Sequence, residues 1–312
     1  MTVHVILNRQ ARHLVADRGL RSALLAESRG ARVHETSTLE DLDRVVLSLA
    51  DQAPRCVVLA GGDGTYMASL TALERVFGEH LPPVALAPGG TVGTVARNLV
   101  GTKHRTAHWV MQAALAEPLR TGGCPTLRVT DNLGGSRVGF IFGAGLVSSF
   151  FDEYYALERR GLTGAAWIVA KVFAGSFVGA RLTRKVLSPM VATLRVDGVQ
   201  QKPRAWSLVV ASVVRDLGLH MRLTYRAAER EDRVHLVASA LGPRELGPQM
   251  PRVLRGVPLR GQGHVDTLTQ SLELEFPGEG GTYILDGEPF RARVVRVVAG
   301  PVVRVVRPVL KP

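Results

Sequence analysis

The feature that most constrains this chain is an apolar run that stops abruptly in a glycine-rich turn, Val57-Val58-Leu59-Ala60-Gly61-Gly62-Asp63-Gly64-Thr65. A short apolar run bounded by turn residues is typical of a buried strand. The three glycines let backbone N–H groups face an anion, and Thr65 can cap a helix that begins at Tyr66. The pattern predicts a strand, a phosphate-binding loop and a helix in direct succession.

Asp63 is the unusual member of this loop. A carboxylate repels phosphate unless a divalent cation lies between them or a proton has to be removed there. We therefore interpret Asp63 as a magnesium ligand or a catalytic residue. For the loop taken alone, a glycine-rich turn with a solvated Asp63 is an equally good interpretation, because short glycine motifs match many unrelated proteins.

Composition and charge narrow the class of partner. The 312 residues are 46% hydrophobic and 21% charged, enough for a sizeable core and about two domains. A net charge of +12 favours polyanions such as nucleic acid, nucleotide phosphates or an anionic bilayer. Aromatic residues are only 5%, with no RNA-binding aromatic motif, zinc finger or dense basic tract. Nucleic acid is therefore not the expected partner.

The cysteines and the first residues indicate the compartment. Of the two cysteines, Cys56 is embedded in the apolar run and Cys124 is isolated, which is a reduced, cytosolic pattern. The first residues lack a basic segment and a long apolar stretch, so no signal peptide is expected. The chain is predicted to be cytoplasmic.

The first 122 residues alternate between strand and helix patterns. Apolar strands are expected at residues 3–7, 57–60 and 84–87 and a second, shorter strand at 31–35, each leading into a helical pattern. The fourth strand ends in a second glycine turn, Pro88-Gly89-Gly90-Thr91. This alternation predicts a parallel sheet with right-handed crossovers, with both glycine turns at its carboxyl edge.

The pattern becomes mostly β after Thr121-Gly122-Gly123, so we place a domain boundary there, with domains at 1–122 and 123–312. The second domain is expected to be larger and mainly antiparallel, a β-sandwich interrupted by two helices within 150–187. Its strands are expected at 127–130, 138–142, 191–196, 207–213, 234–238, 272–276 and 282–285, with two more within 294–309 that present a basic face of Arg296, Arg304 and Arg307.

The second of these helices contains an apolar stretch at residues 165–173. Lys171 and several nearby glycines argue against a membrane span, which needs roughly 20 predominantly apolar residues. Two interpretations stay open. One is packing against the core, and the other is a lid or membrane-facing element.

Three short motifs in this order resemble the diacylglycerol kinase-type lipid kinases: Gly61–Thr65, Pro88–Thr91 and Leu285-Asp286-Gly287-Glu288-Pro289. That family includes sphingosine and ceramide kinases and soluble bacterial lipid kinases, and its first domain is related to the NAD kinases. The resemblance extends over nearly the whole chain and includes Gly143-Ala144-Gly145-Leu146, Arg215-Asp216-Leu217-Gly218 and Glu231-Asp232-Arg233-Val234.

The resemblance implies an ATP-binding catalytic domain at 1–122 and a lipid-binding β domain at 123–312, with the lipid in a cleft between them. ATP and Mg²⁺ are the implied cofactors, and Asp63 is the implied magnesium ligand. The residues implied to contact the nucleotide are Asn8, Thr36, Thr38, Gly61, Gly62, Asp63, Gly64, Thr65, Gly90 and Thr91.

Phosphoryl transfer to a lipid hydroxyl needs a group that accepts the hydroxyl proton. By the resemblance, Glu288 is our candidate for this base, Asp286 supports it, and Asp63 engages magnesium or orients the acceptor. The alternative for Asp286-Gly287-Glu288 is a tight hairpin turn, because Asp-Gly is a strong turn signal.

The chain departs from the family pattern at three places. Gly93-Thr94 replaces a usual Asn-Asp pair, and Arg9-Gln10-Ala11-Arg12 follows Asn8 where proline and small residues are usual. The turn that holds a structural magnesium in many bacterial members reads Glu231-Asp232-Arg233-Val234-His235 here. Arginine and histidine do not favour that ion, so we do not expect a metal there.

The resulting prediction is an ATP-dependent lipid kinase that acts at an anionic membrane surface. Its acceptor is expected to be a hydroxyl of a diacylglycerol-like, sphingoid or ceramide, or phospholipid molecule. Two alternatives stay open: an NAD kinase-like enzyme, and a non-catalytic nucleotide- or lipid-binding relative. The sequence leaves the oligomeric state open, with a homodimer as one alternative.

Overall fold

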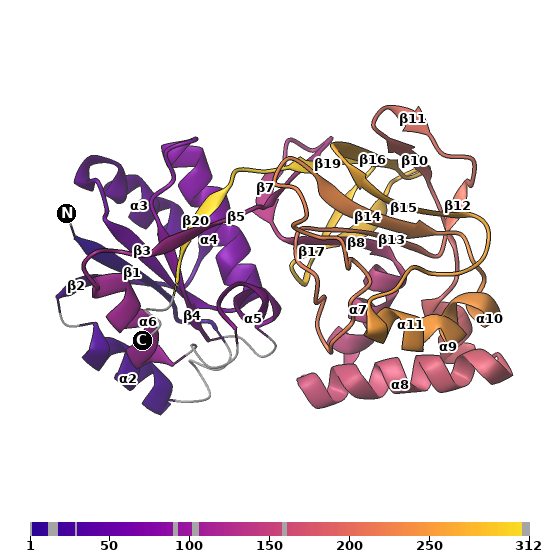
Figure 1. Ribbon diagram of the computed structural model, residues 1–312, viewed down its shortest axis with the longest axis horizontal. Helices are drawn as coiled ribbons and strands as arrows, with labels where there is room; N and C mark the ends of the chain where they lie inside the picture. Colours follow the sequence, from indigo (N-terminus) through magenta and orange to yellow (C-terminus); the bar gives the residue numbers. More distant parts are fainter. Residues whose placement is uncertain are drawn as a thin grey trace. The chain divides into compact units, whose positions relative to one another are not determined.

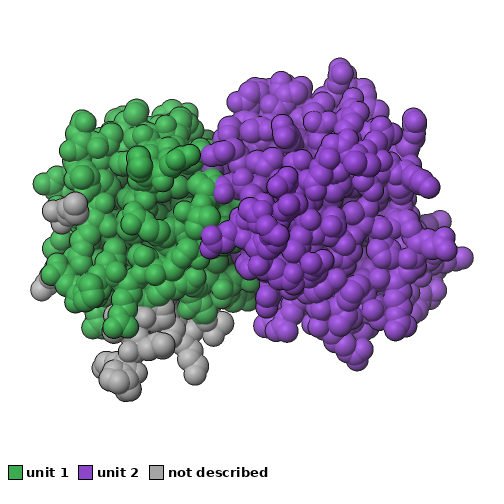
Figure 2. All heavy atoms as spheres, turned by 45° about the horizontal axis from the view of Figure 1, so that its top comes forward, with its two compact units in different colours: residues 1–126, 301–312 green, residues 127–300 purple. Residues whose placement is uncertain are grey.

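The computed structural model describes residues 2–11, 18–28, 30–89, 93–101, 106–157 and 161–307. The chain forms two compact units, and one of them is built from both ends of the sequence. Met1–Thr126 and Pro301–Pro312 make the first unit, and Leu127–Gly300 makes the second (Figure 2).

The first unit is a six-stranded sheet with the order β2-β1-β3-β4-β20-β5. β1 to β4 are mutually parallel, β20 runs parallel to β4, and β5 is antiparallel to β20. The chain moves outward from β1 to β2 and in the opposite direction from β3 to β4, so its direction reverses between β1 and β3. The strands are β1 Val3–Asn8, β2 Ala31–Thr36, β3 Cys56–Gly61, β4 Val84–Pro88, β5 Thr121–Cys124 and β20 Val303–Val306.

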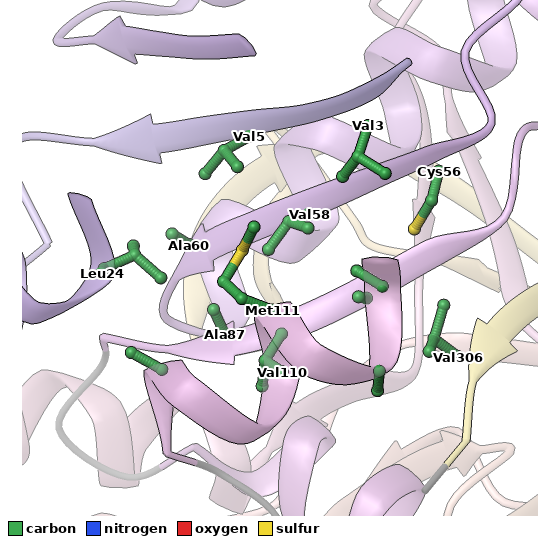
Figure 3. Close-up of a cluster of buried hydrophobic side chains, with 14 of the residues drawn as sticks. Val3, Val5, Leu24, Cys56, Val58, Ala60, Ala87, Val110, Met111 and Val306 are labelled. Atoms are coloured by element: carbon green, nitrogen blue, oxygen red, sulfur yellow. The ribbon is translucent and has the colours of Figure 1, made fainter. Parts of the chain in front are cut away.

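Helices cover this sheet because its central strands are apolar on both faces. β3 is buried along its whole length, as expected for a central parallel strand. On one face, Val5 and Val58 of the sheet pack with Leu24 of α2 and with Val110 and Met111 of α6 (Figure 3). The helices are α2 Arg18–Glu27, α3 Leu39–Leu49, α4 Asp63–Phe77, α5 Thr94–Val100 and α6 Ala107–Leu115, with a short 3₁₀ turn at Ala50–Gln52.

The second unit contains two six-stranded antiparallel sheets (Figure 1). One has the order β11-β10-β16-β19-β6-β7, and the other has the order β15-β14-β13-β8-β17-β18. β9 and β12 form a separate pair. The strands are β6 Leu127–Asp131, β7 Ser136–Gly139, β8 Ile141–Gly145, β9 Met190–Val191, β10 Thr193–Val196, β11 Val199–Gln200, β12 Ala205–Trp206, β13 Leu208–Ser212, β14 Val234–Ser239, β15 His264–Thr269, β16 Ser271–Glu275, β17 Gly281–Leu285, β18 Glu288–Ala292 and β19 Val294–Ala299.

Burial shows how the layers of the second unit are arranged. β13 and β14 are buried at every residue, whereas β16 alternates between buried and half-buried positions. One sheet is therefore covered on both faces and the other on one, which makes a sandwich with helices on its outer side. These helices are α7 Leu146–Ala156, α8 Leu162–Val178, α9 Arg181–Val186, α10 Pro243–Leu246, a 3₁₀ turn at Gly247–Gln249 and α11 Met250–Arg255.

The apolar stretch of residues 165–173 lies in α8, and one face of it packs on the core. Ile168 and Val172 join a buried cluster with Val210 of β13 and Val237 of β14. The core-packing interpretation is therefore confirmed for that face. Within the described part of the chain, no helix is both long enough and apolar enough to cross a membrane.

The fold class is as predicted, but the end of the chain lies in a different unit from the one expected. The proposed boundary at 122/123 falls inside β5, because residues 121–124 pair with β20 in the first sheet. Residues 301–307 therefore belong to the first unit rather than to the β domain. The glycine-rich stretch resembles a linker in sequence because its pairing partner is about 180 residues away, beyond the reach of any local pattern.

Three smaller expectations are wrong. Residues 138–142 form parts of two strands, β7 and β8, that are separated at Phe140. The region 150–187 contains three helices rather than two. Arg296 and Arg304 are exposed as expected, but Arg307 is not, because its guanidinium donates to the Leu99 carbonyl and occupies the space beside a glycine of β5.

Candidate active site

The carboxyl ends of the four parallel strands meet at one edge of the first sheet. Asn8 at the end of β1 is level with Thr36 at the end of β2, and Gly61 at the end of β3 is level with Pro88. The loops that follow β1 and β3 leave the sheet where its direction reverses, the usual position of a ligand site in such folds. The glycine turn after β3 and the described start of the second one, Pro88-Gly89, thus lie at the predicted edge.

The glycine turn after β3 leads into a helix earlier than the sequence suggested. α4 begins at Asp63, not at Tyr66, and Gly62 precedes it in an extended conformation. Gly62 has no side chain to cap the helix, and nothing in the described residues accepts a hydrogen bond from the amides of Gly64 and Thr65. Free amides at the first turn of a helix favour an anion such as phosphate.

Gly61 is required by close packing rather than by an unusual backbone angle. A Cβ atom at this position would lie 2.5 Å from Cβ of Thr65 and would also collide with its hydroxyl. The Gly61 carbonyl accepts a hydrogen bond from the Gly89 amide at 2.7 Å. Gly61 therefore holds the first turn of α4 against β3 and joins the two glycine turns.

We expect Gly61→Ala to destabilise the protein by about 1–3 kcal/mol, because the added methyl group overpacks against Thr65. It is also expected to weaken binding of the ATP that the resemblance implies, because the first turn of α4 has to move. Urea unfolding and equilibrium dialysis with labelled ATP measure the two effects. Gly242→Ala is the matched control, since that glycine has an ordinary φ of −68° and a Cβ atom added there would lie 3.6 Å from a Glu245 carboxylate oxygen, a normal contact distance. Wild-type stability and ATP affinity in Gly61→Ala would contradict this packing role.

Asn8 joins the loop after β1 to the loop after β3. Its Nδ2 donates to Oγ1 of Thr65 at 2.8 Å, and its Oδ1 accepts from the amide of Gln10 at 2.9 Å. Thr65 is thus tied to β1 and is not the helix cap that the sequence suggested. Arg9, which follows Asn8, lies 3.5 Å from Glu35 and is mostly exposed.

The carboxylate of Asp63 anchors the start of α5. Its Oδ2 accepts a hydrogen bond from the Thr94 amide at 2.8 Å, and its Oδ1 accepts one from the Val95 amide at 3.1 Å. Gly93, which precedes α5, adopts a left-handed conformation with φ 58°. Asparagine tolerates that conformation better than most residues, so Gly93 keeps a backbone shape suited to the asparagine usual in the family. Sequence reasoning missed this anchor, because nothing local links residue 63 to residue 94.

Two further residues predicted to contact the nucleotide, Thr36 and Thr38, make hydrogen bonds within the first unit. Thr38 caps α3, and its Oγ1 accepts from the Asp41 amide at 3.1 Å while the Asp41 carboxylate accepts from the Thr38 amide at 3.2 Å. Thr36 is buried, and its hydroxyl donates to the Leu7 carbonyl at 3.5 Å. Both hydroxyls therefore have structural partners. Gly90 and Thr91 lie outside the described residues.

In the second unit, Asp286 and Gly287 form the tight turn between β17 and β18. Both have positive φ, 48° and 90°, as a two-residue hairpin turn requires. The buried Asp286 carboxylate accepts hydrogen bonds from the amides of Phe140 at 3.0 Å and Ile141 at 2.8 Å. The absent side chain of Gly139 leaves space for it. The hairpin interpretation is thus confirmed, and Asp286 fixes the turn to the start of β8.

Glu288 is exposed at the first position of β18, directly after this turn. The hydroxyl of Tyr155 in α7 donates to the Gly287 carbonyl at 2.6 Å, and a Cβ atom added to Gly287 would lie 3.6 Å from the ring of Phe151. The turn is therefore held on one side by β8 and on the other by α7. Glu288 is an exposed carboxylate on a firmly supported backbone.

A partly buried ion pair supports the same hairpin. Asp131 Oδ2 accepts from Arg137 Nη1 at 2.7 Å and from the Tyr283 hydroxyl at 2.9 Å. The Arg137 guanidinium lies 4.1 Å above the ring of Phe290 in β18. Burial opposes ionisation of Asp131, but the hydrogen bonds from Arg137 and from the Gly135 amide hold its pKa below the ordinary value. The β17–β18 hairpin, which carries Glu288, is thus held by contacts to Tyr283 in one strand and to Phe290 in the other.

With Glu288 as the base and ATP as the substrate that the resemblance implies, we expect Tyr155→Phe to lower kcat several-fold with little change in KM for ATP, because loss of one hydrogen bond loosens the turn beside Glu288. The same change is expected to lower the free energy of unfolding by about 1 kcal/mol. Steady-state kinetics and urea unfolding measure both. Tyr154→Phe, which alters the adjacent tyrosine, is the control. If Tyr155→Phe has wild-type kcat, the hydroxyl has no positioning role.

The turn that binds magnesium in many relatives is held here by other contacts. Asp232 accepts hydrogen bonds from Arg230 at 2.8 and 3.0 Å. Next to it, Nε2 of the buried His235 lies 2.8 Å from Asp266, which also accepts from the Tyr225 hydroxyl at 3.0 Å. Burial, together with the bond to Asp266, raises the pKa of Tyr225 to about 12. No group of three or more metal-ligating side chains gathers anywhere in the described ranges.

Part of the chain matches the model of a known protein family. Residues 2–123 match the family model described as the diacylglycerol kinase catalytic domain. The comparison with curated proteins finds no match.

Solved structures resemble the chain over almost its full length. A protein from Bacillus anthracis str. Sterne, provisionally named a diacylglycerol kinase, has a TM-score of 0.69 and 15% identity, covering 98% of this chain and 95% of its own. A diacylglycerol kinase structure from the same organism has a TM-score of 0.63 and 12% identity, covering 98% and 96%. Yeast NADH kinase in complex with NADH has a TM-score of 0.50 and 10% identity, covering 100% and 84%.

At these identities the solved structures establish a shared fold, and the sequence match is confined to the first unit. The fold likeness covers both the α/β part and the antiparallel part of the chain. The resemblance to the diacylglycerol kinase family is thereby confirmed: residues 2–123 match the model of its catalytic domain, and the chain shares its fold over 98% of its length with solved structures that bear the family's name.

Proposed function

We propose that this protein is an ATP-dependent lipid kinase that transfers the γ-phosphate to a hydroxyl of a diacylglycerol-like, sphingoid or ceramide, or phospholipid acceptor. The observation that carries the proposal is the loop at the end of β3. Its glycines, the bridge from Asn8 and the amides of Gly64 and Thr65, which have no acceptor among the described residues, support an anion site at the point where the sheet reverses direction. This loop lies within the residues that match the catalytic-domain family.

The nucleotide phosphates are proposed to lie on the first turn of α4. Positioning and charge neutralisation account for most of the catalysis of phosphoryl transfer, so backbone amides and a helix dipole suit the task. Asn8 and Gly61 keep that turn in place, and the Asp63 anchor keeps the start of α5 beside it. Thr36, Thr38, Gly90 and Thr91 remain proposed contacts from the neighbouring strand ends.

Magnesium is proposed to arrive with ATP and to be held by Asp63. Mg²⁺ in kinase sites uses one or two protein carboxylates together with substrate phosphates and water. A single carboxylate at the phosphate loop fits that requirement. When bound, the ion neutralises charge on the transferred phosphate, while Asp63 also keeps its hydrogen bonds to the start of α5.

Glu288 is proposed to accept the proton of the lipid hydroxyl. The hydroxyl becomes a better nucleophile as its proton leaves, and a positioned carboxylate is a suitable acceptor. The rigid turn at Asp286-Gly287 supports this role, because a base has to be held at hydrogen-bond distance from its substrate. The role requires that this turn reach the bound nucleotide in the working enzyme.

Two other functions are compatible with parts of the same geometry. The fold likeness to yeast NADH kinase keeps an NAD kinase-like activity as the alternative enzyme. A non-catalytic nucleotide- or lipid-binding role is the other alternative, because Gly93-Thr94 lacks the polar side chains usual in the family. We favour a cytoplasmic enzyme that acts at an anionic membrane surface, in line with the net charge of +12.

The experiment is to incubate the protein with MgATP and a total lipid extract, and in parallel with NAD. Mass spectrometry then follows the gain of one phosphoryl group in each acceptor. A phosphorylated lipid supports the proposal and identifies the acceptor class. Phosphorylated NAD supports the alternative enzyme. Bound ATP without any phosphorylated product supports the non-catalytic role.

A further inference from the structure

The outer face of α8 is apolar and exposed, although the opposite face is packed on the core. Trp167, Phe177 and Val178 are 51%, 62% and 79% exposed. Figure 1 shows α8 at the margin of the second unit, with the other helices of that unit on one side of it only. The exposed positions recur at helical spacing, and we call them the α8 face: Ala166, Trp167, Ala170, Lys171, Ala174, Phe177 and Val178.

The α8 face is set in a basic segment. Residues 161–188 contain Lys171, Arg181, Arg184 and Lys185 and no acidic residue. Lys171 stacks on the Trp167 ring, with its Nζ 3.6 Å from the ring centroid. Lys185 pairs with Glu153 of α7 at 2.5 Å, but within the described ranges no acidic side chain pairs with Arg181 or Arg184. Two exposed arginines therefore follow the apolar face without a neutralising partner.

This combination fits an anionic lipid surface. Exposed aromatic and aliphatic side chains enter the boundary between headgroups and acyl chains, and adjacent arginines bind lipid phosphates. Lysine and arginine also extend their stems along apolar surface while their charges stay in water. A helix with one face fixed to the core and the other apolar can contact a bilayer without crossing it.

A second copy of the chain fits this face less well. A two-fold dimer contact places the same patch opposite itself. Lys171 lies in the middle of α8, so such a contact, with the two helices antiparallel, brings Lys171 against Lys171, and no acidic residue on the segment compensates. An isolated charge at a buried contact is costly, whereas an anionic headgroup pairs with it.

We propose that the α8 face, together with Arg181 and Arg184, docks the second unit on an anionic phospholipid bilayer. The proposal deepens the lipid kinase function and rests on it for its purpose, but docking is measurable without catalysis. Trp167 and Phe177 enter the interface, and the two arginines contact phosphate groups. The docked face brings the protein to the surface where a lipid acceptor resides.

The test is flotation with phosphatidylcholine vesicles that do or do not contain phosphatidylglycerol. The wild-type protein is expected to bind the anionic vesicles about tenfold more tightly than the neutral ones, with binding that weakens as salt is added. Phe177→Ser/Val178→Ser is expected to lower binding to the anionic vesicles about tenfold. Arg181→Gln/Arg184→Gln is expected to lower it by a similar factor, about tenfold, and to reduce its salt dependence.

Matched control variants test whether vesicle binding depends on the α8 face or on exposed apolar and basic side chains in general. Leu133→Ser removes a 75% exposed leucine from a turn elsewhere in the same unit, and Arg296→Gln removes an exposed arginine of β19. Both are expected to bind vesicles like the wild type. Circular dichroism and thermal unfolding check that every variant is folded.

Tryptophan emission gives a second readout. Trp206 is fully buried and Trp109 is partly buried, so Trp167 is the indole that a bilayer can reach. Emission is expected to shift to shorter wavelength on adding anionic vesicles, and Trp167→Phe is expected to abolish the shift. A shift that persists in Trp167→Phe would overturn the assigned orientation.

Several outcomes would overturn the proposal. Equal binding of the wild-type protein to neutral and anionic vesicles would do so, as would unchanged binding in Phe177→Ser/Val178→Ser. A dimer in sedimentation that this variant disperses, without vesicle binding, would assign the face to self-association.

Kinase activity on a water-soluble short-chain diacylglycerol tests the proposed kinase function separately from membrane docking, because this acceptor does not require a bilayer. If the wild type docks but transfers phosphate neither to this acceptor nor to any lipid of the extract, the proposed function fails and the docking stands. If the variants keep that activity and bind vesicles normally, only the docking fails.

Discussion

Glu288→Gln is expected to lower turnover by about 10²–10⁴-fold while ATP affinity hardly changes. Glutamine keeps the size and much of the hydrogen bonding of glutamate but cannot accept the hydroxyl proton. The exposed position of Glu288 makes an effect on folding small. Single-turnover transfer from labelled ATP measures the chemical step, and equilibrium dialysis measures the affinity for ATP.

Glu279→Gln is the matched control, because Glu279 is an almost fully exposed glutamate in the turn before β17. It is expected to have wild-type turnover. Normal turnover in Glu288→Gln would move the role of base to Asp63. Complete loss of ATP binding in the same variant would mean that Glu288 is structural, and the Asp286-Gly287 turn would then be only a hairpin.

Asp63→Ala is expected to leave a folded protein with little or no kinase activity. The substitution removes the proposed magnesium ligand and leaves the amides of Thr94 and Val95 without their acceptor. An unsatisfied buried donor costs about 1–3 kcal/mol, so unfolding by urea should also become easier. Kinase assays across a magnesium titration and urea unfolding measure the two consequences.

A comparison of two substitutions separates the roles of Asp63. Asp63→Asn keeps one acceptor oxygen for the start of α5 but loses the charge that favours Mg²⁺. It is expected to recover part of the stability lost in Asp63→Ala without recovering activity. Asp43→Ala, which breaks an exposed pair with Arg75 at 3.1 Å, is the control and should change little. Wild-type turnover in Asp63→Ala would remove Asp63 from the mechanism.

The local patterns are enough to predict the first sheet and its carboxyl edge. β1, β3 and β4 are mostly apolar runs, β2 is a shorter and more polar strand, and alternation with helices fixes a parallel arrangement. The antiparallel second half is also evident from short alternating strands. These features depend on residues that are neighbours in sequence, so sequence reasoning can reach them.

The contacts between distant segments could not be predicted in the same way. β20 joins the first sheet although it follows the whole second unit in sequence. Val303 and Val305 are buried, but their sequence pattern is that of an ordinary strand and does not identify the sheet to which it belongs. The alternation of valine and arginine at the end of the chain predicts a strand but not its partner. The position of Arg307 against β5 follows only from that pairing.

In the candidate site, too, the local motifs can be predicted from the sequence but the contacts between distant segments cannot. The glycine loop and the Asp-Gly turn are visible in the sequence, but the partners of their carboxylates are not. Asp63 binds amides of α5, and Asp286 binds amides at the start of β8. Thr65 and Thr38 are both expected from the sequence to line the nucleotide, yet one is held by Asn8 and the other caps α3. Hydrogen bonding by side chains depends on tertiary neighbours that motifs do not specify.

Transfer of the γ-phosphate of labelled ATP into the lipid phase decides whether this protein is a lipid kinase. The protein is incubated with Mg²⁺, labelled ATP and vesicles of a lipid extract, and the label in the organic phase is compared with the ADP formed. We expect one labelled lipid for each ADP, with the label lost in Glu288→Gln. ADP without labelled lipid, or label found only in NADP when NAD is supplied, would contradict the lipid kinase function.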